Sequence, residues 1–376
     1  MNEQADVIVI GAGIAGASFA CFAAAHARVV VLEREAHPGM HATGRSAAMF
    51  SASYGSAQVR ALTRASRPFF DAPPAGFARH PILSPRGALV VGSAAQAGTV
   101  QALHEAVRPH AASVQLLDGA AVRGMVSVLH PESAQIGLLE PDAADIDVNE
   151  LHQGYLRGLR DQGGTLVCNA APRAIERSRG GWEIDLGHRS LRAPVLVNAA
   201  GAWVDEVAAL AGVAPIGIEP RRRSAFLFAG PPEVPFARWP LVIDADETWY
   251  FKPDAGLLLG SCANADPVAP HDVVPEELDI ALGIHRIEAA TALRIRRPTR
   301  TWAGLRSFVA DGDLVGGFAL DAPGFFWLAA QGGYGIQTSA AMGQACAHVA
   351  LSRPLPAALQ DAGIDARLIA PRPGPS

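Results

Sequence analysis

Three glycines and one acid near the start of the chain have the spacing of a dinucleotide-binding turn. Gly11, Gly13 and Gly16 follow an apolar run, and Glu33 ends a second apolar run. Gly11 allows the tight turn, Gly13 lets the backbone approach a pyrophosphate, and Gly16 lets a following helix pack closely on a strand. The helix N-terminus would present N–H groups and partial positive charge to the phosphates. Glu33 can accept hydrogen bonds from ribose hydroxyls, and its charge argues against the 2′-phosphate of NADP.

A glycine-rich loop without a ligand is the alternative interpretation of this motif. It is disfavoured because an apolar strand pattern precedes the glycines, an Ala-rich stretch follows them and the acid lies at the right distance. The motif alone does not separate FAD from NAD.

The elements that must position this turn are visible in the apolar patterns. Residues 7–10 and 29–32 are short apolar runs typical of buried strands, with a helical stretch between them. Farther along, residues 150–161 have helical periodicity, and residues 165–169 and 192–198 look like buried strands. We interpret these elements as two halves of one nucleotide-binding domain.

Two inserts and a closing segment remain. The inserts cover roughly residues 80–145 and 215–300, and the second contains strand-like runs that predict an antiparallel sheet over the cofactor. These runs are residues 224–228, 249–252 and 257–260. Residues 324–350 read as strand, glycine turn and helix, which would return to the nucleotide-binding domain and bring a second helix N-terminus near the cofactor.

Length and composition restrict the class of protein. The chain has 376 residues, 49% hydrophobic and 18% charged, which is typical of a globular enzyme with two domains. The net charge of −5 and the lack of a long basic run argue against a nucleic-acid partner.

Targeting and metal signals are also absent from the sequence. Four cysteines form no CxxC pair, so we expect no disulfide and a reducing compartment. The twelve histidines form no metal-binding pattern, so we expect no metal. Residues 322–347 are uncharged but interrupted by glycines and glutamines, so we expect no integral membrane segment. These features favour a cytoplasmic protein, with peripheral contact at the inner face of the membrane left open.

Four segments together resemble the D-amino-acid-oxidase-like (DAO) superfamily of FAD-dependent oxidoreductases. They read GAGIAG from Gly11, HATGRSAAMFSASYG from His41, VNAAGAW from Val197 and AAQGGYGIQTS from Ala329. The second and fourth are most similar to bacterial D-amino-acid dehydrogenases of the D-arginine dehydrogenase type.

The resemblance implies an α/β fold, with a Rossmann-like FAD-binding domain of the glutathione-reductase type and a substrate domain built on an antiparallel or mixed β-sheet. We assign residues 1–80, 146–215 and 301–370 to the FAD-binding domain, residues 81–145 and 216–300 to the substrate domain, and residues 371–376 to a flexible tail. The expected cofactor contacts are Gly11, Gly13, Ile14, Ala15, Gly16, Glu33, Arg34, Thr43, Gly44, Arg45, Ser46, Ala48, Ala200, Gly201, Gly304, Gly332, Gly333, Tyr334, Gly335, Ile336 and Gln337.

Related amine oxidases often tether FAD through a cysteine in the last third of the chain. The matching stretch, residues 304–312, contains no cysteine, so we expect non-covalent FAD. Trp203 follows the strand end at Ala200 and Gly201, and either packs in the core or contacts the cofactor.

A flavin that oxidises an amino acid takes a hydride from Cα at N5, so the protein must hold the substrate carboxylate. Arginine matches a carboxylate with two hydrogen bonds. Arg306 lies between apolar neighbours, and the resemblance places a carboxylate-binding arginine there. It also favours Arg223 over its neighbour Arg222, since strand alternation points only one of them inward. A solvated charge run is the alternative for this cluster.

The resemblance assigns further substrate contacts to two tyrosines and to the last glycine turn. Tyr250 would help to hold the carboxylate, and Tyr54 would cover the cavity as an aromatic lid. The carbonyl of Gly333 would accept a hydrogen bond from the substrate amine, and Gln337 would order the loop or contact substrate.

Two departures from the D-arginine dehydrogenase pattern bear on specificity. Met49 replaces a histidine, and residues 85–89 offer no carboxylate for a guanidinium side chain. Leu241 and Ile243 would make the side-chain region apolar. We therefore expect neutral or hydrophobic D-amino acids as substrates.

The leading hypothesis is an FAD-dependent D-amino-acid dehydrogenase that forms an imino acid, which hydrolyses to a 2-oxo acid and ammonia. Its electron acceptor would be a quinone or another carrier. The rivals are an oxidase that uses oxygen, a 2-hydroxy-acid dehydrogenase of the same superfamily, and a flavin- or NAD-binding module without turnover.

Overall fold

The computed structural model describes residues 2–372, and a six-stranded sheet forms its centre. Its strand order is β10-β3-β2-β14-β22-β21, and all neighbours are parallel except β22 and β21. The strands are β2 (Val7–Ile10), β3 (Val29–Leu32), β10 (Thr165–Val167), β14 (Val195–Asn198), β21 (Val315–Phe318) and β22 (Phe325–Ala329). The strands expected at residues 7–10 and 29–32 are confirmed, as is the Rossmann-like α/β class.

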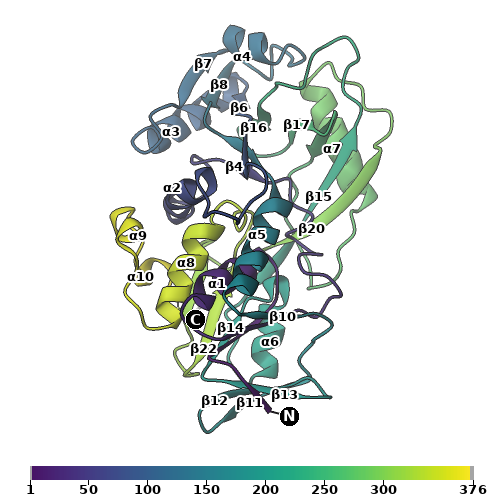
Figure 1. Ribbon diagram of the computed structural model, residues 1–376. Coiled ribbons are helices and arrows are strands. Elements are labelled where there is room, and N and C mark those ends of the chain that lie inside the picture. Colours follow the sequence, from purple (N-terminus) through teal and green to yellow (C-terminus); the bar gives the residue numbers. More distant parts are fainter. Residues whose placement is uncertain (1, 373–376) are drawn as a thin grey trace.

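Both faces of this sheet are covered, which explains why β2 and β3 are apolar at every position. The helices α1, α2, α5 and α8 form one layer, and α6 with a small sheet covers the other face (Figure 1). The bounds are α1 (Ile14–Ala24), α2 (Ala57–Asp71), α5 (Val148–Asp161), α6 (Val204–Leu210) and α8 (Ser339–Ala350). Short helices follow at α9 (Ala357–Asp361) and α10 (Ala366–Ile369), and η2 (Gly201–Trp203) precedes α6.

Residues 192–198 form two strands rather than the single one we expected. The chain is interrupted at Pro194, which has no N–H to continue a ladder. The first part, β13, pairs with a different sheet, whereas the second part, β14, joins the central one. The small sheet comprises β1 (Asn2–Gln4), β13 (Ser190–Ala193), β12 (Gly181–Asp185) and β11 (Ala174–Ser178).

A nine-stranded mixed sheet forms the upper part of the molecule in Figure 1. Both inserts contribute to it, and only β16 and β6 pair in parallel. The strands are β6 (Ala88–Gly92), β7 (Gln115–Asp118), β8 (Ile136–Glu140), β15 (Glu219–Phe228), β16 (Leu241–Asp244), β17 (Tyr250–Asp254), β18 (Leu257–Ser261), β19 (Asp266–Pro267) and β20 (Arg300–Phe308). The associated helices are η1 (Ala94–Gln96), α3 (Ala97–Val107), α4 (Gly119–Met125) and α7 (Glu277–Ala290).

A three-stranded sheet lies at the junction of the first insert with the rest of the chain. It pairs β9 (Ala144–Ile146) with β4 (Met49–Phe50) and β5 (Leu83–Pro85). β4 belongs to the segment that carries Tyr54, so this sheet ties that segment to the substrate-domain insert.

The division into two domains stays a prediction, and strand β20 crosses the boundary that we assigned. β20 falls in the part of the chain that we assigned to the FAD-binding domain, yet it pairs with β15 from residue 300 to residue 308. The expected flexible tail falls mostly outside the described residues, and its second residue, Arg372, pairs with Asp311.

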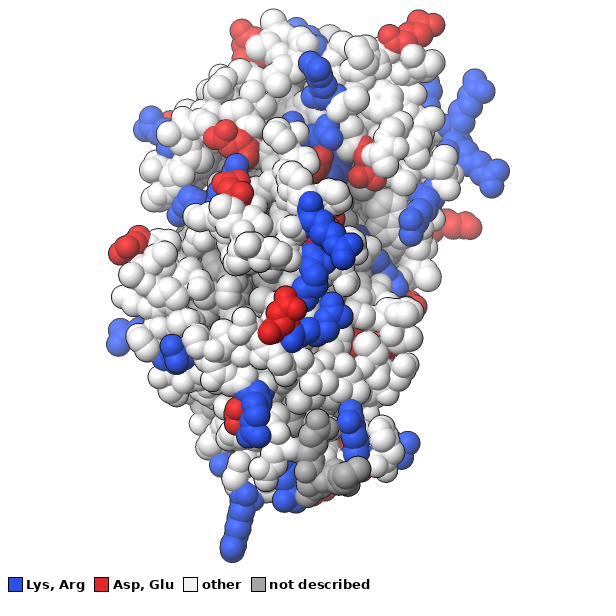
Figure 2. Space-filling view, viewed as in Figure 1, with Lys and Arg blue, Asp and Glu red and all other residues white. Residues whose placement is uncertain are grey.

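Charges on the face shown in Figure 2 are scattered over a mostly uncharged surface, and acidic groups border the short run of basic ones near its centre. Within residues 2–372, no helix is long and apolar enough to cross a membrane.

The glycine turn after β2 provides a test of the fold. Gly11 has φ of +100°, and a Cβ there would lie 2.5 Å from the carbonyl oxygen of Ala199. We expect Gly11→Ala to lower the free energy of unfolding by more than the ~1–3 kcal/mol that a strained φ alone costs. The control is Gly76→Ala, where φ is +82° but no atom lies within 4 Å of the added Cβ. Urea unfolding measures both, and equal losses would contradict the predicted clash.

Candidate active site

Three neighbouring cavities follow the carboxyl end of the central sheet and continue below the mixed sheet. The glycine-turn cavity has a volume of about 430 Å³ and is lined by Gly11, Gly13 and Glu33. The arginine cavity, of about 420 Å³, is lined by Arg223 and Arg306. A connecting cavity of about 100 Å³ shares lining residues with both, so the three cavities adjoin one another.

The expected cofactor residues fall along this space. The glycine-turn cavity is lined by Gly11, Gly13, Ile14, Ala15, Glu33, Arg34, Thr43, Arg45, Ala200, Gly201 and Gly332. The connecting and arginine cavities are lined by Ser46, Ala48, Gly304, Gly333, Tyr334, Gly335, Ile336 and Gln337. Gly16 and Gly44 line none of them. A Cβ at Gly16 would lie 2.0 Å from the carbonyl oxygen of Gly11, so this glycine serves the packing of α1 against the turn.

Glu33 is buried, and its carboxylate binds backbone N–H groups of the turn and of its own segment. Its two carboxylate oxygens accept hydrogen bonds from the N–H groups of Ala12, at 2.9 Å, and Glu35, at 3.0 Å. The Thr43 hydroxyl accepts a hydrogen bond from the N–H of Ile14 at 3.0 Å, so it caps the start of α1. Both side chains border the glycine-turn cavity, where ribose hydroxyls could share the remaining acceptor capacity of Glu33.

His152 contacts this turn from another element, which the sequence did not reveal. It lies on α5, and its Nε2 contacts the carbonyl oxygen of Ala12 at 2.8 Å. Burial lowers the pKa of His152, and the Ala12 carbonyl and Glu33 oppose that effect. The ring is therefore neutral and donates to the turn. A histidine among apolar helical positions gave no signal that would separate it from a core residue.

Trp203 lines the glycine-turn cavity, and the side chains of Arg34 and His41 pack against its ring. The Arg34 guanidinium lies 3.9 Å from the centre of its ring, and the ring of His41 lies 4.8 Å away. Glu35 accepts a hydrogen bond from Arg34 and contacts His41, each at 2.9 Å. Trp203 thus both packs against protein groups and lines the cavity, so the two alternatives for it are not exclusive.

Arg45 borders the glycine-turn and connecting cavities, and its side chain also links its own segment to β20 and to the loop after β19. Its guanidinium donates to the carbonyl oxygens of Val273, at 2.9 Å, and Ala303, at 3.2 Å, and pairs with Asp272. Its backbone carbonyl accepts a hydrogen bond from the indole of Trp302 at 2.9 Å.

Gln337 leaves one buried donor without a partner. Its Oε1 accepts a hydrogen bond from the N–H of Ser51 at 3.2 Å, and with this amide orientation Nε2 has no partner among residues 2–372. The side chain is only 3% exposed and lines the arginine cavity. An unsatisfied buried donor is costly, so this group fits a ligand that presents an acceptor, such as a flavin carbonyl.

Strand register explains why Arg223 and Arg306 reach one cavity. In the antiparallel β15–β20 pair, Arg223 faces Gly304 and Arg221 faces Arg306. Alternation therefore puts Arg223 and Arg306 on the same face of the sheet and Arg222 on the other. Arg222 instead forms ion pairs with Asp279 and Glu276. The structure thus brings together the two arginines that the sequence analysis preferred.

Neither cavity arginine forms an ion pair with a carboxylate in residues 2–372. Burial and the nearby charge of Arg306 lower the pKa of Arg223. Burial also acts to lower the pKa of Arg306, but Tyr54 and Tyr250 offset it, and the net shift is upward. Two guanidiniums in one partly desolvated space favour an anionic ligand.

Three of the four tyrosines surround these guanidiniums. Tyr54, Tyr250 and Tyr334 all line the arginine cavity, and the rings of Tyr54 and Tyr334 meet edge to face at 5.2 Å. Burial raises the pKa of Tyr54, and it raises the pKa of Tyr334 to about 12, so both hydroxyls stay protonated donors at neutral pH. Gly333 lies directly over Arg306, since a Cβ there would be 2.8 Å from a guanidinium nitrogen.

Charged side chains line the arginine cavity beside Leu241 and Ile243, so this cavity is not apolar throughout. The arginine cavity is also lined by three carboxylates, Glu140, Asp244 and Glu247. Glu140 accepts hydrogen bonds from the segment 51–53, and Asp244 accepts them from Thr248 and Gln96. Glu247 is exposed and lies 3.4 Å from the Tyr54 hydroxyl. The sequence did not reveal these acids because they come from β8, from the end of β16 and from the turn after it.

The part of the wall around Leu241 and Ile243 is apolar, as expected. It is formed by Met49, Ala88, Val90, Leu103, Leu138, Leu241, Ile243 and Ala245. Most of them come from β6, β8 and β16, so the mixed sheet supplies most of this apolar wall.

The parallel sheet with its glycine turn indicates a dinucleotide-binding protein, and the two cavity arginines provide a site for an anion. A family model described as DAO, FAD dependent oxidoreductase, matches residues 6–349, and the chain belongs to this family.

Individual known proteins are more distant. FAD-dependent oxidoreductase domain-containing protein 1 of Mus musculus is 24% identical over 93% of this chain and 82% of its own length. Mitochondrial dimethylglycine dehydrogenase of Homo sapiens is 30% identical over 28% of this chain, which spans only 12% of that protein. The crystal structure of glycine oxidase from Geobacillus kaustophilus superposes with a TM-score of 0.84 over 100% of both chains at 19% identity, a likeness of fold.

The neutral state of His152 predicts a pH dependence of stability. Its folded pKa lies below the unfolded value near 6.5, so the unfolded chain binds more protons as the pH falls. The contribution of the neutral His152 ring to the free energy of unfolding is fully present above pH ~6.5, and it is lost as the pH falls through the lowered pKa. We expect His152→Gln to flatten the decline of the unfolding free energy between about pH 7 and 5.

The control for this prediction is His110→Gln, at an exposed position outside the turn. Urea unfolding at several pH values measures the slope. The same slope for His152→Gln as for the unaltered protein would contradict the assignment of a neutral, buried ring.

Proposed function

We propose that this protein oxidises D-amino acids with neutral or hydrophobic side chains to imino acids, which then hydrolyse to 2-oxo acids and ammonia. One observation carries the proposal: Arg223 and Arg306 line a single cavity, without acid partners among the described residues, beside a dinucleotide-type cavity. When bound, FAD supplies the acceptor for the hydride that leaves Cα.

The residues of the chain would bind and orient the substrate. Arg223 and Arg306 hold the carboxylate, with the hydroxyls of Tyr54 and Tyr250 as further donors. The carbonyl of Gly333 accepts from the amine, and Gln337 donates to the cofactor or substrate. The apolar wall receives the side chain, and Glu247 at the rim contacts Tyr54, which covers the cavity.

No strong base is needed when the amine binds in its neutral form. Its nitrogen lone pair forms the C=N bond as the hydride departs, and the resulting iminium carries the positive charge. The names of the relatives are consistent with an amine substrate, since they include a dimethylglycine dehydrogenase and a glycine oxidase.

The proposal extends to the cofactor linkage, the acceptor and the location. The lining residues of the three cavities include no cysteine, which supports non-covalent FAD. We further propose a dehydrogenase that passes electrons to a quinone or a similar carrier, in the cytoplasm, where the four free cysteines suit a reducing medium.

Non-covalent binding predicts that acid precipitation of the purified protein releases its flavin. Absorbance at flavin wavelengths should appear in the supernatant, and the pellet should be colourless. A yellow pellet that keeps its colour after washing in denaturant would contradict non-covalent attachment.

A panel of amino acids tests the reaction itself. Under anaerobic conditions D-leucine and D-phenylalanine should bleach the flavin, whereas their L-enantiomers should not and D-arginine should act more slowly. Repeating turnover with oxygen and with an artificial acceptor separates an oxidase from a dehydrogenase. Bleaching by 2-hydroxy acids alone, or by no substrate, would overturn the proposal.

Arg306→Ala should weaken substrate handling strongly. We expect kcat/KM to fall by an amount equivalent to ~2–5 kcal/mol, because a buried charge-assisted hydrogen bond to the carboxylate is lost. The control is Arg221→Ala, since Arg221 lies on the same face of β15 but pairs with Glu219 and stacks on Phe308. Loss of bound flavin, rather than of substrate affinity, would reassign Arg306 to the cofactor.

A further inference from the structure

The Arg223 guanidinium is fixed through one of its three nitrogens. Its Nε donates a hydrogen bond to the main-chain carbonyl oxygen of Asn264 at 2.6 Å. This contact leaves both terminal amino groups for a ligand. Those two groups form an edge that matches the two oxygens of a carboxylate. The position of the Asn264 carbonyl therefore sets the direction in which this edge points.

Asn264 lies where the partner of β15 changes. Phe226 of β15 faces Gly260 of β18, and Arg222 faces Asp266 of β19. Between these pairs, the three residues 223–225 oppose the five residues 261–265, so the strand ladder is interrupted by a bulge. A loop of this kind would not by itself hold a carbonyl in one place.

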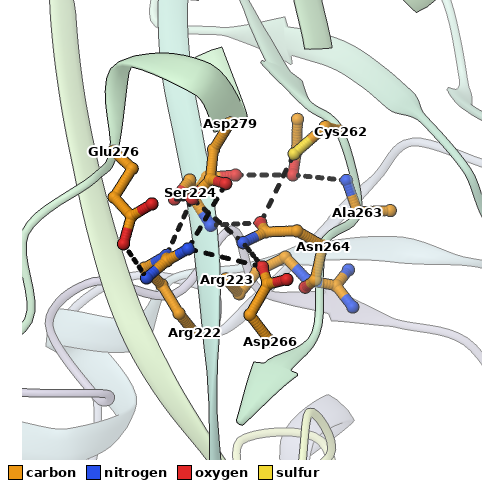
Figure 3. A network of polar contacts seen from close by, with 10 residues as sticks. Arg222, Arg223, Ser224, Cys262, Ala263, Asn264, Asp266, Glu276 and Asp279 are labelled. Carbon is orange, nitrogen blue, oxygen red and sulfur yellow. Dashed lines mark hydrogen bonds and ion pairs between the residues drawn. The ribbon is translucent and has the colours of Figure 1, made fainter. Parts of the chain in front are cut away.

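The side chain of Asn264 restores the link across this bulge. Its Oδ1 accepts a hydrogen bond from the N–H of Ser224 at 2.8 Å, in place of a ladder bond. Asn264 thus binds two consecutive residues of β15, the side chain of Arg223 and the backbone of Ser224. Figure 3 shows these groups together beside β15.

The amide nitrogen of Asn264 is held in turn by two acids. Nδ2 donates to Asp266 at 2.8 Å and to Asp279 at 3.1 Å. Asp279 is buried on α7 and accepts hydrogen bonds from the Ser224 hydroxyl at 2.7 Å and from Nε of Arg222 at 2.8 Å. Arg222, on the far face of β15, therefore helps to fix the acid that orients Asn264 (Figure 3).

The polar cluster around Arg222 carries more acids than bases. Arg222 is one cation among three acids, Asp266, Glu276 and Asp279. The cluster is therefore net negative, and it adjoins Arg223 through Asn264. Negative charge behind a buried guanidinium stabilises its protonated form without occupying the edge that a ligand needs.

We propose that Asn264 is a positioning residue of the substrate site, which orients the Arg223 guanidinium toward the carboxylate of the ligand. The inference rests on the proposed role of Arg223 in binding that carboxylate. A purely structural role in closing the bulge is the alternative, and it makes a different prediction. If Asn264 had only that role, its substitution would lower the free energy of unfolding, and any effect on ligand affinity would be the same with and without Arg223.

The test is a double-mutant cycle on carboxylate binding to the FAD-loaded protein. Benzoate is the probe, because it has a carboxylate and no amine that the flavin could oxidise, and titration calorimetry gives its Kd. Asn264→Ala keeps the carbonyl that Arg223 binds but removes the side-chain hydrogen bonds that hold this carbonyl in place. We expect it to raise the Kd about tenfold or more, because the charge-assisted bond between Arg223 and the carboxylate is misaligned, with the flavin absorbance unchanged. In the Arg223→Ala background, the same substitution should have little further effect.

Two further variants complete the design. Asn264→Asp keeps an acceptor for Ser224 but replaces the donor to two acids with a third acid, so it should also raise the Kd. This variant takes the place of Asn264→Ala if Asn264→Ala does not fold. Glu276→Gln is the matched control, since it removes an exposed partner of Arg222 and leaves the contacts of Asn264 intact.

Equal effects of the Asn264 substitutions with and without Arg223, or unchanged benzoate affinity in a folded variant, would overturn the inference. So would a failure of the unaltered protein to bind benzoate. If benzoate binding shows the expected coupling but D-amino acids do not bleach the flavin, the positioning role stands and the proposed substrate is wrong.

Discussion

Two guanidinium groups face one cavity and form no ion pair with an acid in residues 2–372, and this is the feature on which the functional account depends. Burial makes an isolated cation costly, and two of them also repel each other, which is why the pKa of Arg223 is lowered. Tyr54 and Tyr250 offset part of this cost at both arginines, and Glu247 does so at Arg223. The remainder is best relieved by a bound anion, and a carboxylate matches the geometry of the two arginines.

The fold supplies this arrangement by joining two sheets at the site. The central parallel sheet ends in the glycine turn, and the mixed sheet places β15 and β20 over the connecting cavity. Two side chains bind across the boundary between the sheets. Arg45 donates hydrogen bonds to the loop after β19 and to strand β20, and Glu140 of β8 accepts hydrogen bonds from segment 51–53. The glycine-turn cavity and the arginine cavity are thus fixed relative to each other by partly buried polar contacts.

Local patterns predicted the parts of this structure that depend on neighbouring residues. The glycine turn and the strands at residues 7–10 and 29–32 follow from spacing and apolar pattern. Alternation indicated that only one of Arg222 and Arg223 points inward, and the family resemblance favoured Arg223. Long-range contacts did not follow. Asn264 reaches Arg223 across a bulge, His152 reaches the glycine turn from α5, and Glu140 enters the arginine cavity from the first insert. Pairings between such distant segments leave no periodic signal in one sequence, and Pro194 divided a strand that its apolar residues favoured.

A crystal structure of the FAD-loaded protein with a bound, non-oxidisable carboxylate tests the central claim most directly. The account predicts FAD along the three cavities and the carboxylate between the guanidiniums of Arg223 and Arg306. Either arginine turned away into an ion pair with a protein acid, or a carboxylate bound elsewhere, would contradict it.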